Sequence, residues 1–357
     1  MERIENSRTI NTDFYTSNDM YEKVKEQIFA RSWQYVCHER NLMYSGQQFP
    51  LTYMEGLLDE PLFLSRDNDE VHCLSNVCTH RGNLLIKHPQ KKKKLVCDYH
   101  GRRFALNGKF EYMPEFETAE NFPSPCDNLT KIPLTKWGPY FFVSLEPGFE
   151  LQNVLNEMNK RVGFLPLSDF KFDELRSKDY LVNANWALYC ENYLEGFHIP
   201  FVHPDLNKAL EGSEYESISY EHCNLQIGYG KDDTLCFELP EGHIDYGKRV
   251  AAYYYWIYPN MMFNFYPWGL SINIVRPLGL KKCKVSFLSY VLDESKIGDG
   301  AGALLDKVER EDEYVVENVM RGIQSRYYKY GRYSPTMERN VHHFHELLKK
   351  DIPELVE

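Results

Sequence analysis

The chain has 357 residues, 43% of them hydrophobic, and a formal net charge of −11 at pH 7. This length allows two domains with sizeable cores. The negative charge argues against broad nucleic-acid binding, which requires a basic face. The most apolar segment, residues 251–275, is interrupted by prolines and asparagines, so we expect no membrane span. The first residues lack the apolar core of a secretory signal, and we therefore expect a cytoplasmic protein.

In chain order, the first predicted element is a helix at residues 18–33. From about residue 38 to residue 150, short β-type runs alternate with turns rich in glycine, proline and asparagine, which is typical of a small antiparallel β domain. The clearest runs are residues 62–64, 71–74, 95–97 and 140–145. A short helix at residues 151–161 follows this region.

The rest of the chain predicts long strands mixed with helices. We expect helices at residues 186–198 and 303–325. We expect strands, rich in aromatic residues, at residues 249–258, 271–275 and 284–292. A glycine-rich stretch at residues 298–302 does not have the spacing of a dinucleotide-binding loop, so we expect no NAD(P)H site in this chain.

Nine cysteines, an odd number scattered along the chain, do not form the pattern of a disulfide framework. Two of them belong to paired motifs, Cys78-Thr-His80 and, after sixteen intervening residues, Cys97-Asp-Tyr-His100. Two cysteines and two histidines on facing loops could bind a structural zinc ion. Their setting in a β domain, with a glycine after each motif, instead resembles the Rieske fold, where two cysteines bind one iron of a [2Fe–2S] cluster and two histidines bind the other.

Rieske proteins of respiratory complexes carry an additional disulfide between the two loops. The corresponding positions here look like Asn83 and Tyr99, so that disulfide is absent. The resemblance is therefore to the lower-potential Rieske domains of soluble oxygenases and their ferredoxins.

A second set of candidate ligands lies in Glu195-Gly-Phe-His198-Ile-Pro-Phe-Val-His203. On a helix, Glu195 and His198 would be neighbours on one face because they are three residues apart. His203 follows His198 by five residues, and a straight helix could not direct both at one metal. Pro200 removes a helical N–H and forces a kink or a stop, which would let both histidines face the same ion.

The third ligand should be a carboxylate on another element. Asp312 falls inside the apolar stripe of the predicted helix 303–325, whereas Glu311 and Glu313 fall outside it. A bare carboxylate on a buried face is costly without a cation. His198, His203 and Asp312 would form a 2-His-1-carboxylate triad that leaves one face of Fe(II) open for O₂, water and substrate. The predicted stripe consists of Leu305, Val308, Val315, Val319 and Ile323.

Together the motifs resemble the α subunit of Rieske non-heme iron, ring-hydroxylating-type oxygenases over nearly the whole chain, as far as Gly331-Arg-Tyr-Ser-Pro335. The resemblance implies an α+β fold, with an all-β Rieske domain at residues 38–150 inserted in a helix-grip catalytic domain at residues 151–357, an antiparallel sheet with a long helix. Residues 1–37 are expected to pack on the catalytic domain. A homotrimer is also implied, in which the cluster of one subunit delivers electrons to the iron of the next.

The resemblance further implies that Glu195 links a Rieske histidine to His198, and that Asn192 belongs to the catalytic machinery. Most family members have aspartate where this chain has Glu195, and the longer side chain resembles the carnitine-oxygenase branch. The sequence around Asn192 resembles choline monooxygenase.

Both branches act on quaternary ammonium compounds, which bind to aromatic faces through cation–π attraction. With 26 tyrosines and 21 phenylalanines, the chain could supply such faces. We therefore expect O₂-dependent hydroxylation of a small quaternary ammonium substrate. Ring hydroxylation or demethylation of an aromatic substrate, and electron transfer without oxygenation, remain the alternatives. Electrons would come from NAD(P)H only through a separate flavin and iron–sulfur reductase.

Overall fold

The computed structural model describes residues 3–203, 215–231, 235–298 and 305–356, which form two compact units. The smaller unit spans Ala30–Gly148, and the larger unit combines the segments on either side of it. These limits lie close to those expected for an inserted domain, and the domain assignment itself stays a prediction. Among the described residues, no helix is long and apolar enough to cross a membrane.

The smaller unit consists of antiparallel sheets, as expected for a small β domain. One sheet has the order β1-β11-β10, the second has the order β5-β2-β3-β4-β9, and the third has the order β6-β7-β8. The strands are β1 (Gln34–His38), β2 (Gln47–Tyr53), β3 (Glu60–Asp67), β4 (Glu70–Ser75), β5 (Gln90–Lys91), β6 (Leu95–Val96), β7 (Arg103–Phe104), β8 (Phe110–Tyr112), β9 (Lys131–Ile132), β10 (Leu134–Trp137) and β11 (Tyr140–Val143).

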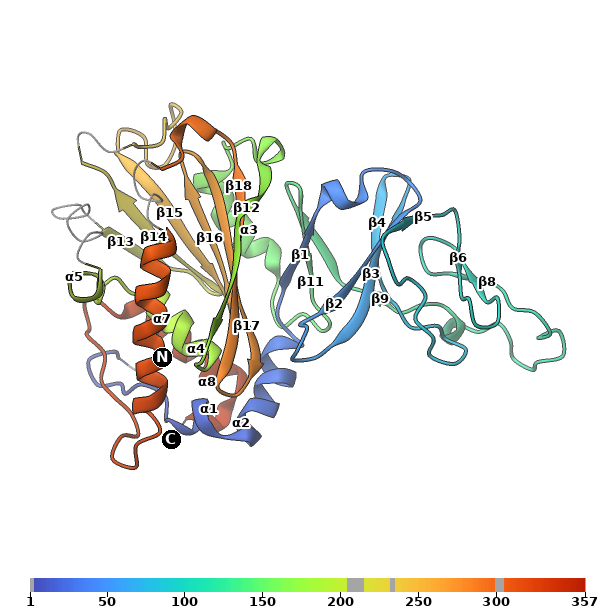
Figure 1. The fold of residues 1–357 in the computed structure, drawn as a ribbon, viewed down its shortest axis with the longest axis horizontal. Helices are drawn as coiled ribbons and strands as arrows, with labels where there is room; N and C mark the ends of the chain where they lie inside the picture. The colour runs from blue at the N-terminus through green and yellow to red at the C-terminus, as the bar shows by residue number, and fades with distance from the viewer. Residues whose placement is uncertain (1–2, 204–214, 232–234, 299–304, 357) are drawn as a thin grey trace. The chain divides into compact units, whose positions relative to one another are not determined.

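The larger unit is built on a seven-stranded antiparallel sheet with the order β12-β18-β17-β16-β15-β14-β13 (Figure 1). Its long helix α7 completes the helix-grip arrangement, which confirms the predicted α+β class. The strands are β12 (Lys171–Val182), β13 (Tyr215–Ser219), β14 (Cys223–Tyr229), β15 (Val250–Ile257), β16 (Met261–Tyr266), β17 (Gly269–Gly279) and β18 (Lys282–Val291). The helices are α1 (Asp13–Thr16), α2 (Asn18–Lys23), the π-helical turn η1 (Val24–Phe29), α3 (Leu151–Val162), α4 (Trp186–Tyr193), α5 (Ile199–Val202), α7 (Leu305–Gly322) and α8 (Arg339–Asp351).

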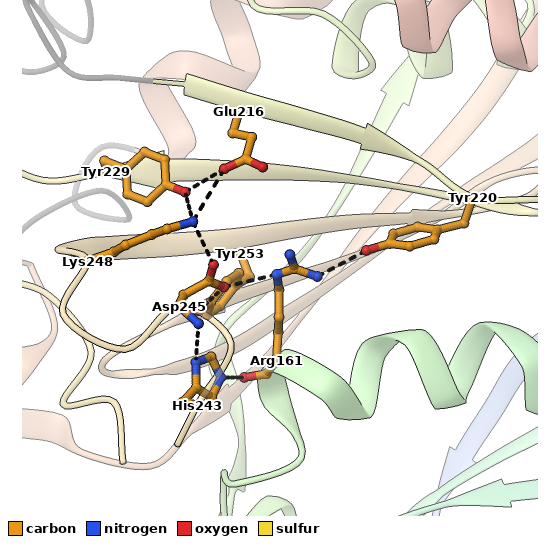
Figure 2. A network of polar contacts seen from close by, with 8 residues as sticks. All are labelled: Arg161, Glu216, Tyr220, Tyr229, His243, Asp245, Lys248 and Tyr253. Carbon is orange, nitrogen blue, oxygen red and sulfur yellow. Dashed lines mark hydrogen bonds and ion pairs between the residues drawn. The ribbon is translucent and has the colours of Figure 1, made fainter. Parts of the chain in front are cut away.

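Side chains alternate between the two faces of this sheet, and different helices cover each face. On one face, Tyr193 of α4 donates a hydrogen bond to Asn264 of β16 (2.6 Å), and Phe344 of α8 packs edge-on against Trp256 of β15. On the other face, the end of α3 is held by the buried carboxylate of Asp245. Figure 2 shows this second attachment, which fixes the loop between β14 and β15 to α3.

Three predicted helices end earlier than expected, and one of them, predicted to end at residue 325, is α7, which ends at Gly322. The helix predicted at residues 18–33 is α2 followed by the π-helical turn η1, and it ends at Phe29. The helix predicted at residues 186–198 ends at Tyr193, so Glu195 and His198 lie in the connection to α5 rather than on one continuous helix. The expected start of the helix at residue 303 and most of the glycine-rich stretch 298–302 lie outside the described residues.

The buried side of α7 differs from the predicted stripe by one position. Val319 is 43% exposed, and Val308 and Val315 are only half-buried. The side chain of Leu305 lies outside the described residues. Asp312 is shared by the predicted and the observed stripe. The other inward-facing residues of α7 are Glu309, Val316 and Met320. Ile323, which the predicted stripe also contained, is buried directly after the helix ends at Gly322.

Candidate metal centres

The two Cys–His motifs of the smaller unit form loops with the same hydrogen bonds. In the first loop, the N–H of Gly82 donates to the carbonyl of Cys78 (3.0 Å). In the second, the N–H of Gly101 donates to the carbonyl of Cys97, also at 3.0 Å. Both glycines have positive φ, +69° and +75°, which suits glycine because it has no Cβ. The loops therefore present two equivalent pairs of candidate ligands.

The four candidate ligands lie close together in this unit. Cys78 and Cys97 are each only 2% exposed and belong to one hydrophobic core cluster. His80 and His100 are half-buried, and their ring centroids lie 4.7 Å apart. The structure thus brings together the set predicted from the sequence, with the thiols inside and the imidazoles toward the surface.

The surroundings fit an iron–sulfur cluster. Nδ1 of His100 is buried and has no hydrogen-bond partner among the described residues, as expected for a nitrogen reserved for a metal. Burial opposes ionisation of Cys97, but the N–H of Tyr99 and the Asn83 side chain lower its pKa below the usual value. The Asn83 amide lies 3.5 Å from the Cys97 sulfur. All nine cysteines are free, so none is committed to a disulfide.

The second centre begins at the connection between α4 and α5. Asn185 caps the start of α4 by accepting the N–H of Ala187 at 3.0 Å. After α4 ends, the Glu195 carboxylate accepts the N–H groups of Phe197 and His198 and thereby starts a new turn. Its other oxygen lies 2.7 Å from Nδ1 of His198. Because a carboxylate only accepts, Nδ1 carries the proton and Nε2 is left for a metal.

His203 and Asp312 complete this centre. Nε2 of His203 lies 3.0 Å from Oδ1 of Asp312, and Nε2 of His198 lies 3.4 Å from the same oxygen. One ligand atom from each of the three residues lies within 4.8 Å of the others. The Asp312 side chain is 13% exposed and His203 is 1% exposed. The geometry is that of three ligands converging from α5 and α7 on one point.

The electrostatics of the triad favour a cation. Burial alone would lower the pKa of His198, but Asp312 and Glu195 raise it to about 9. Burial would raise the pKa of Asp312, but the two histidines hold it below its ordinary value. The buried carboxylate therefore attracts positive charge onto the histidines, and a divalent ion can replace that charge. The donor set, two imidazoles and a carboxylate, suits Fe(II).

Two acidic residues near this centre were not identified from the sequence. Oε2 of Glu311, which was expected outside the buried face, lies 2.7 Å from Nδ1 of His203. It holds that ring as Glu195 holds His198, and such contacts orient metal-binding histidines. Glu309 is 3% exposed and accepts a hydrogen bond from Tyr189 of α4. Burial, with Asp312 nearby, raises the pKa of Glu309 to about 8. No local pattern in the sequence identifies either contact.

The predicted catalytic residue Asn192 lies half-buried in the last turn of α4. Its neighbour Tyr193 connects α4 to the sheet, because Gln226 donates to the Tyr193 carbonyl (3.1 Å) and Tyr193 donates to Asn264. Gln226 and Asn264 both pair directly with Tyr254 across strands. The catalytic role of Asn192 stays a prediction.

Comparison with protein families gives two matches. Residues 169–354 match the family described as the ring hydroxylating alpha subunit (catalytic domain). Residues 32–123 match the Rieske [2Fe–2S] domain. The first match spans more than half of the chain and contains all three residues of the triad, and the second contains both Cys–His loops.

The chain is also similar to individual proteins along nearly its whole length. It is 29% identical to a chloroplastic choline monooxygenase of Beta vulgaris, over 96% of this chain and 76% of that protein. It is 26% identical to the carnitine monooxygenase oxygenase subunit of Escherichia coli K12, over 95% and 92%.

Two solved structures illustrate the fold. A quaternary ammonium Rieske monooxygenase in complex with L-carnitine superposes with a TM-score of 0.74 at 22% identity, covering 98% of this chain and 99% of that one. A naphthalene 1,2-dioxygenase from a Rhodococcus species, bound to indole, gives a TM-score of 0.70 at 17% identity, covering 97% and 94%. These likenesses, with the family matches, confirm the resemblance that the motifs indicated. The chain belongs to the ring-hydroxylating α-subunit family of Rieske-type oxygenases, oxidoreductases that use O₂ with a [2Fe–2S] cluster and mononuclear iron.

Proposed function

We propose that this chain is the oxygenase component that hydroxylates a small quaternary ammonium compound, of the choline, carnitine or betaine type. The observation that carries the substrate class is the aromatic group on the sheet face beneath α4. Tyr266 and Trp268 are stacked with centroids 5.2 Å apart, and Tyr254 meets Tyr266 edge-on at 5.8 Å. Aromatic faces attract quaternary ammonium groups, which cannot be bound by hydrogen bonds.

The same sheet face carries buried polar side chains, which supports a polar substrate over a planar hydrocarbon. Asn264 and Ser271 face each other across β16 and β17, and Ser271 faces Ser289 across β17 and β18. These groups already bond within the protein, since Asn264 accepts from Tyr193 and Ser271 donates to Asn273 at 2.7 Å. A hydroxyl or carboxylate could form additional hydrogen bonds with them, and a hydrocarbon could not. The polar residues of this face, each at most 6% exposed, are Gln226, Asn264, Ser271, Asn273 and Ser289.

The charge of the second metal centre favours a cationic substrate. Three carboxylates surround it: Asp312 as a ligand, with Glu195 and Glu311 on the two histidines. A divalent iron neutralises two of these negative charges, and the third is offset only weakly by Lys307, which is 53% exposed and lies 3.9 Å from Glu311. A substrate with a permanent positive charge is therefore attracted to this centre, while a neutral aromatic ring is not.

We assign His198, His203 and Asp312 as the Fe(II) ligands, and Cys78, His80, Cys97 and His100 as the ligands of the cluster. Bound Fe(II) would supply the position where O₂ is activated, and the cluster would supply electrons. Glu195 and Glu311 fix both imidazole rings with Nε2 directed inward. Glu195 is also the group through which we expect electrons to reach His198.

A homotrimer and a separate NAD(P)H-dependent flavin and iron–sulfur reductase complete the proposal. The solved structure of a related quaternary ammonium Rieske monooxygenase gives insights into inter-subunit electron transfer in that protein. The same arrangement here would make Glu195 a contact between neighbouring subunits. Sedimentation of the cluster-loaded chain would then show three copies per particle or a multiple of three.

The substrate assignment is tested by O₂ uptake of the iron-loaded full chain with a generic reductase. Choline, carnitine and betaines should stimulate uptake and give products that contain labelled oxygen from O₂. The matched control is the neutral isostere of choline, with carbon in place of nitrogen, which should be inactive because it has no charge. Stimulation by simple aromatic compounds alone would contradict the proposal, as would an iron content of about two rather than about three per chain.

A further inference from the structure

Arg102 is a buried cation directly behind the second Cys–His loop. It follows Gly101, and its side chain is among the largest fully buried ones of the described residues, at 2% exposure. A guanidinium stays protonated in proteins, so this charge is permanent. Burying a charge is unfavourable unless its surroundings compensate for it. The position of Arg102 therefore needs a physical reason.

The immediate surroundings of Arg102 compensate for only part of its charge. One terminal nitrogen lies 2.5 Å from a carboxylate oxygen of Asp127 and 3.3 Å from the Asp127 carbonyl. The rings of Phe110, Phe122 and Phe104 lie 4.8, 5.6 and 5.7 Å from the guanidinium carbon. Nε is buried and has no hydrogen-bond partner among the described residues. The guanidinium is 2% exposed and its one counter-ion, the Asp127 carboxylate, is 18% exposed, so water screens the negative charge more strongly than the positive one.

Arg102 is attached to both Cys–His loops. The Arg102 carbonyl accepts the N–H of Cys97 at 2.8 Å, which ties the residue to the second loop. On the first loop, the Thr79 hydroxyl donates a hydrogen bond to the Asp127 carbonyl at 2.9 Å, and the Arg102 side chain lies 3.3 Å from the same oxygen. The buried guanidinium is therefore held next to both loops that surround the position of the cluster.

We propose that Arg102 stabilises the reduced state of the [2Fe–2S] cluster and raises its reduction potential. In the oxidised cluster, two sulfides and two thiolates balance the charge of two ferric ions, so the core is neutral. One electron from the reductase makes it singly negative, and no bond to Arg102 forms or breaks. A fixed cation in low dielectric attracts the reduced state and not the neutral one. Asp127 opposes this effect and sets its size.

The test is an anaerobic redox titration of the cluster-loaded full chain, followed by the electron paramagnetic resonance of the reduced cluster. In Arg102→Met, the ratio of reduced to oxidised cluster at a fixed ambient potential should fall about tenfold, which is about 59 mV for one electron. In Asp127→Asn the same ratio should rise, because the opposing charge is removed. Arg103→Gln is the matched control, since the neighbouring Arg103 is exposed and its charge is screened by water. Its ratio should stay within about twofold of the unmodified chain.

Iron and sulfide content and the resonance line shape separate charge from structure. A purely structural role would change cluster content or line shape in Arg102→Met and leave the potential of the intact clusters unchanged. Arg102→Lys, which keeps the charge, should restore most of the potential. The proposal would be overturned if the intact clusters of Arg102→Met had the same reduction potential as those of Arg103→Gln. Should Arg102→Met fail to assemble a cluster, an unchanged or lower potential in Asp127→Asn would overturn it instead.

Discussion

Asp245 is the centre of the buried network that attaches α3 to the sheet (Figure 2). Its carboxylate, 1% exposed, lies 2.9 Å from Nε of Arg161 and 3.0 Å from Nζ of Lys248, and it accepts a hydrogen bond from Tyr253 at 3.0 Å. We predict that Asp245→Asn lowers the free energy of unfolding of the larger unit. Asparagine keeps the shape and one acceptor, but it leaves Arg161, 8% exposed, as a buried cation without a counter-charge.

The size of the loss follows from the burial of each partner. Removing one member of a buried ion pair costs about 3–5 kcal/mol, because the remaining charge stays desolvated. Arg161 keeps its 3.0 Å hydrogen bond to Tyr220, which favours the lower end of this range. Lys248 is 45% exposed and is hydrated in either case, so its lost contact adds at most about 1 kcal/mol. We expect a loss of about 3 kcal/mol.

Hydrogen exchange of the β14 and β15 amides measures this free energy within the larger unit. The matched control is Glu157→Gln, which removes an exposed ion pair with Lys160 on the same helix α3 and should cost at most about 1 kcal/mol. The paired change Arg161→Met with Asp245→Leu should be milder than Asp245→Asn, because no charge is then left unpaired. A loss in Asp245→Asn no larger than that in Glu157→Gln would refute the reasoning.

Three further predictions concern the metal centre and pH. Glu195→Gln should leave the cluster reducible but nearly abolish product in a single turnover, and unimpaired turnover would exclude Glu195 as the link. Glu311→Gln should weaken Fe(II) retention against a chelator about 10- to 100-fold, since it releases the second histidine ring, while Glu313→Gln on the same helix should retain iron normally. Burial lowers the pKa of His343 to about 4, so its contribution to stability is complete above about pH 6.5 and is lost, by up to about 3 kcal/mol, as the pH falls toward 4. Urea unfolding of His343→Gln should lack this pH dependence.

Seven strands were predicted because each lies between turn residues and has a run of apolar or alternating side chains. Other strands, among them β12, β13, β14 and β16 of the seven-stranded sheet, were not identified from the sequence. Residues 62–64 and 71–74 fall within β3 and β4, and residues 284–292 correspond closely to β18. The α+β class followed from the same patterns together with the resemblance. The register of the strands and their order in the sheets depend on contacts between distant segments, and the sequence pattern does not contain them.

The end of α4 was not predictable from periodicity. The cap at Asn185 marks the start of the helix. The residues between Tyr193, where α4 ends, and Gly196 contain no helix-breaking residue, so the helix was predicted to continue to His198. What ends the helix is a side chain that competes with the backbone: Glu195 accepts the N–H groups of Phe197 and His198. Local bonds of this kind replace helical ones without changing the hydrophobic pattern. The resulting connection between α4 and α5 carries the candidate metal ligand His198.

The one-position error on α7 has a similar cause. Reading a helix by its apolar residues assumes that the buried face is apolar, and the valines at 308, 315 and 319 therefore defined the predicted stripe. The face that is buried begins instead with two acids, Glu309 and Asp312, because this end of the helix approaches a cation site.

Asp312 belongs to both the predicted and the observed stripe. It was therefore correctly placed on the buried face, although most of the predicted stripe was shifted by one residue. Glu309 shows why a second acid is tolerated one turn away from it. Burial raises the pKa of Glu309 to about 8, so at neutral pH its carboxyl is mostly protonated. In that state it adds no negative charge beside Asp312 and does not compete with it for the metal. For a helix that carries a metal ligand, the buried face is therefore assigned better from the position of the ligand than from the positions of the apolar residues.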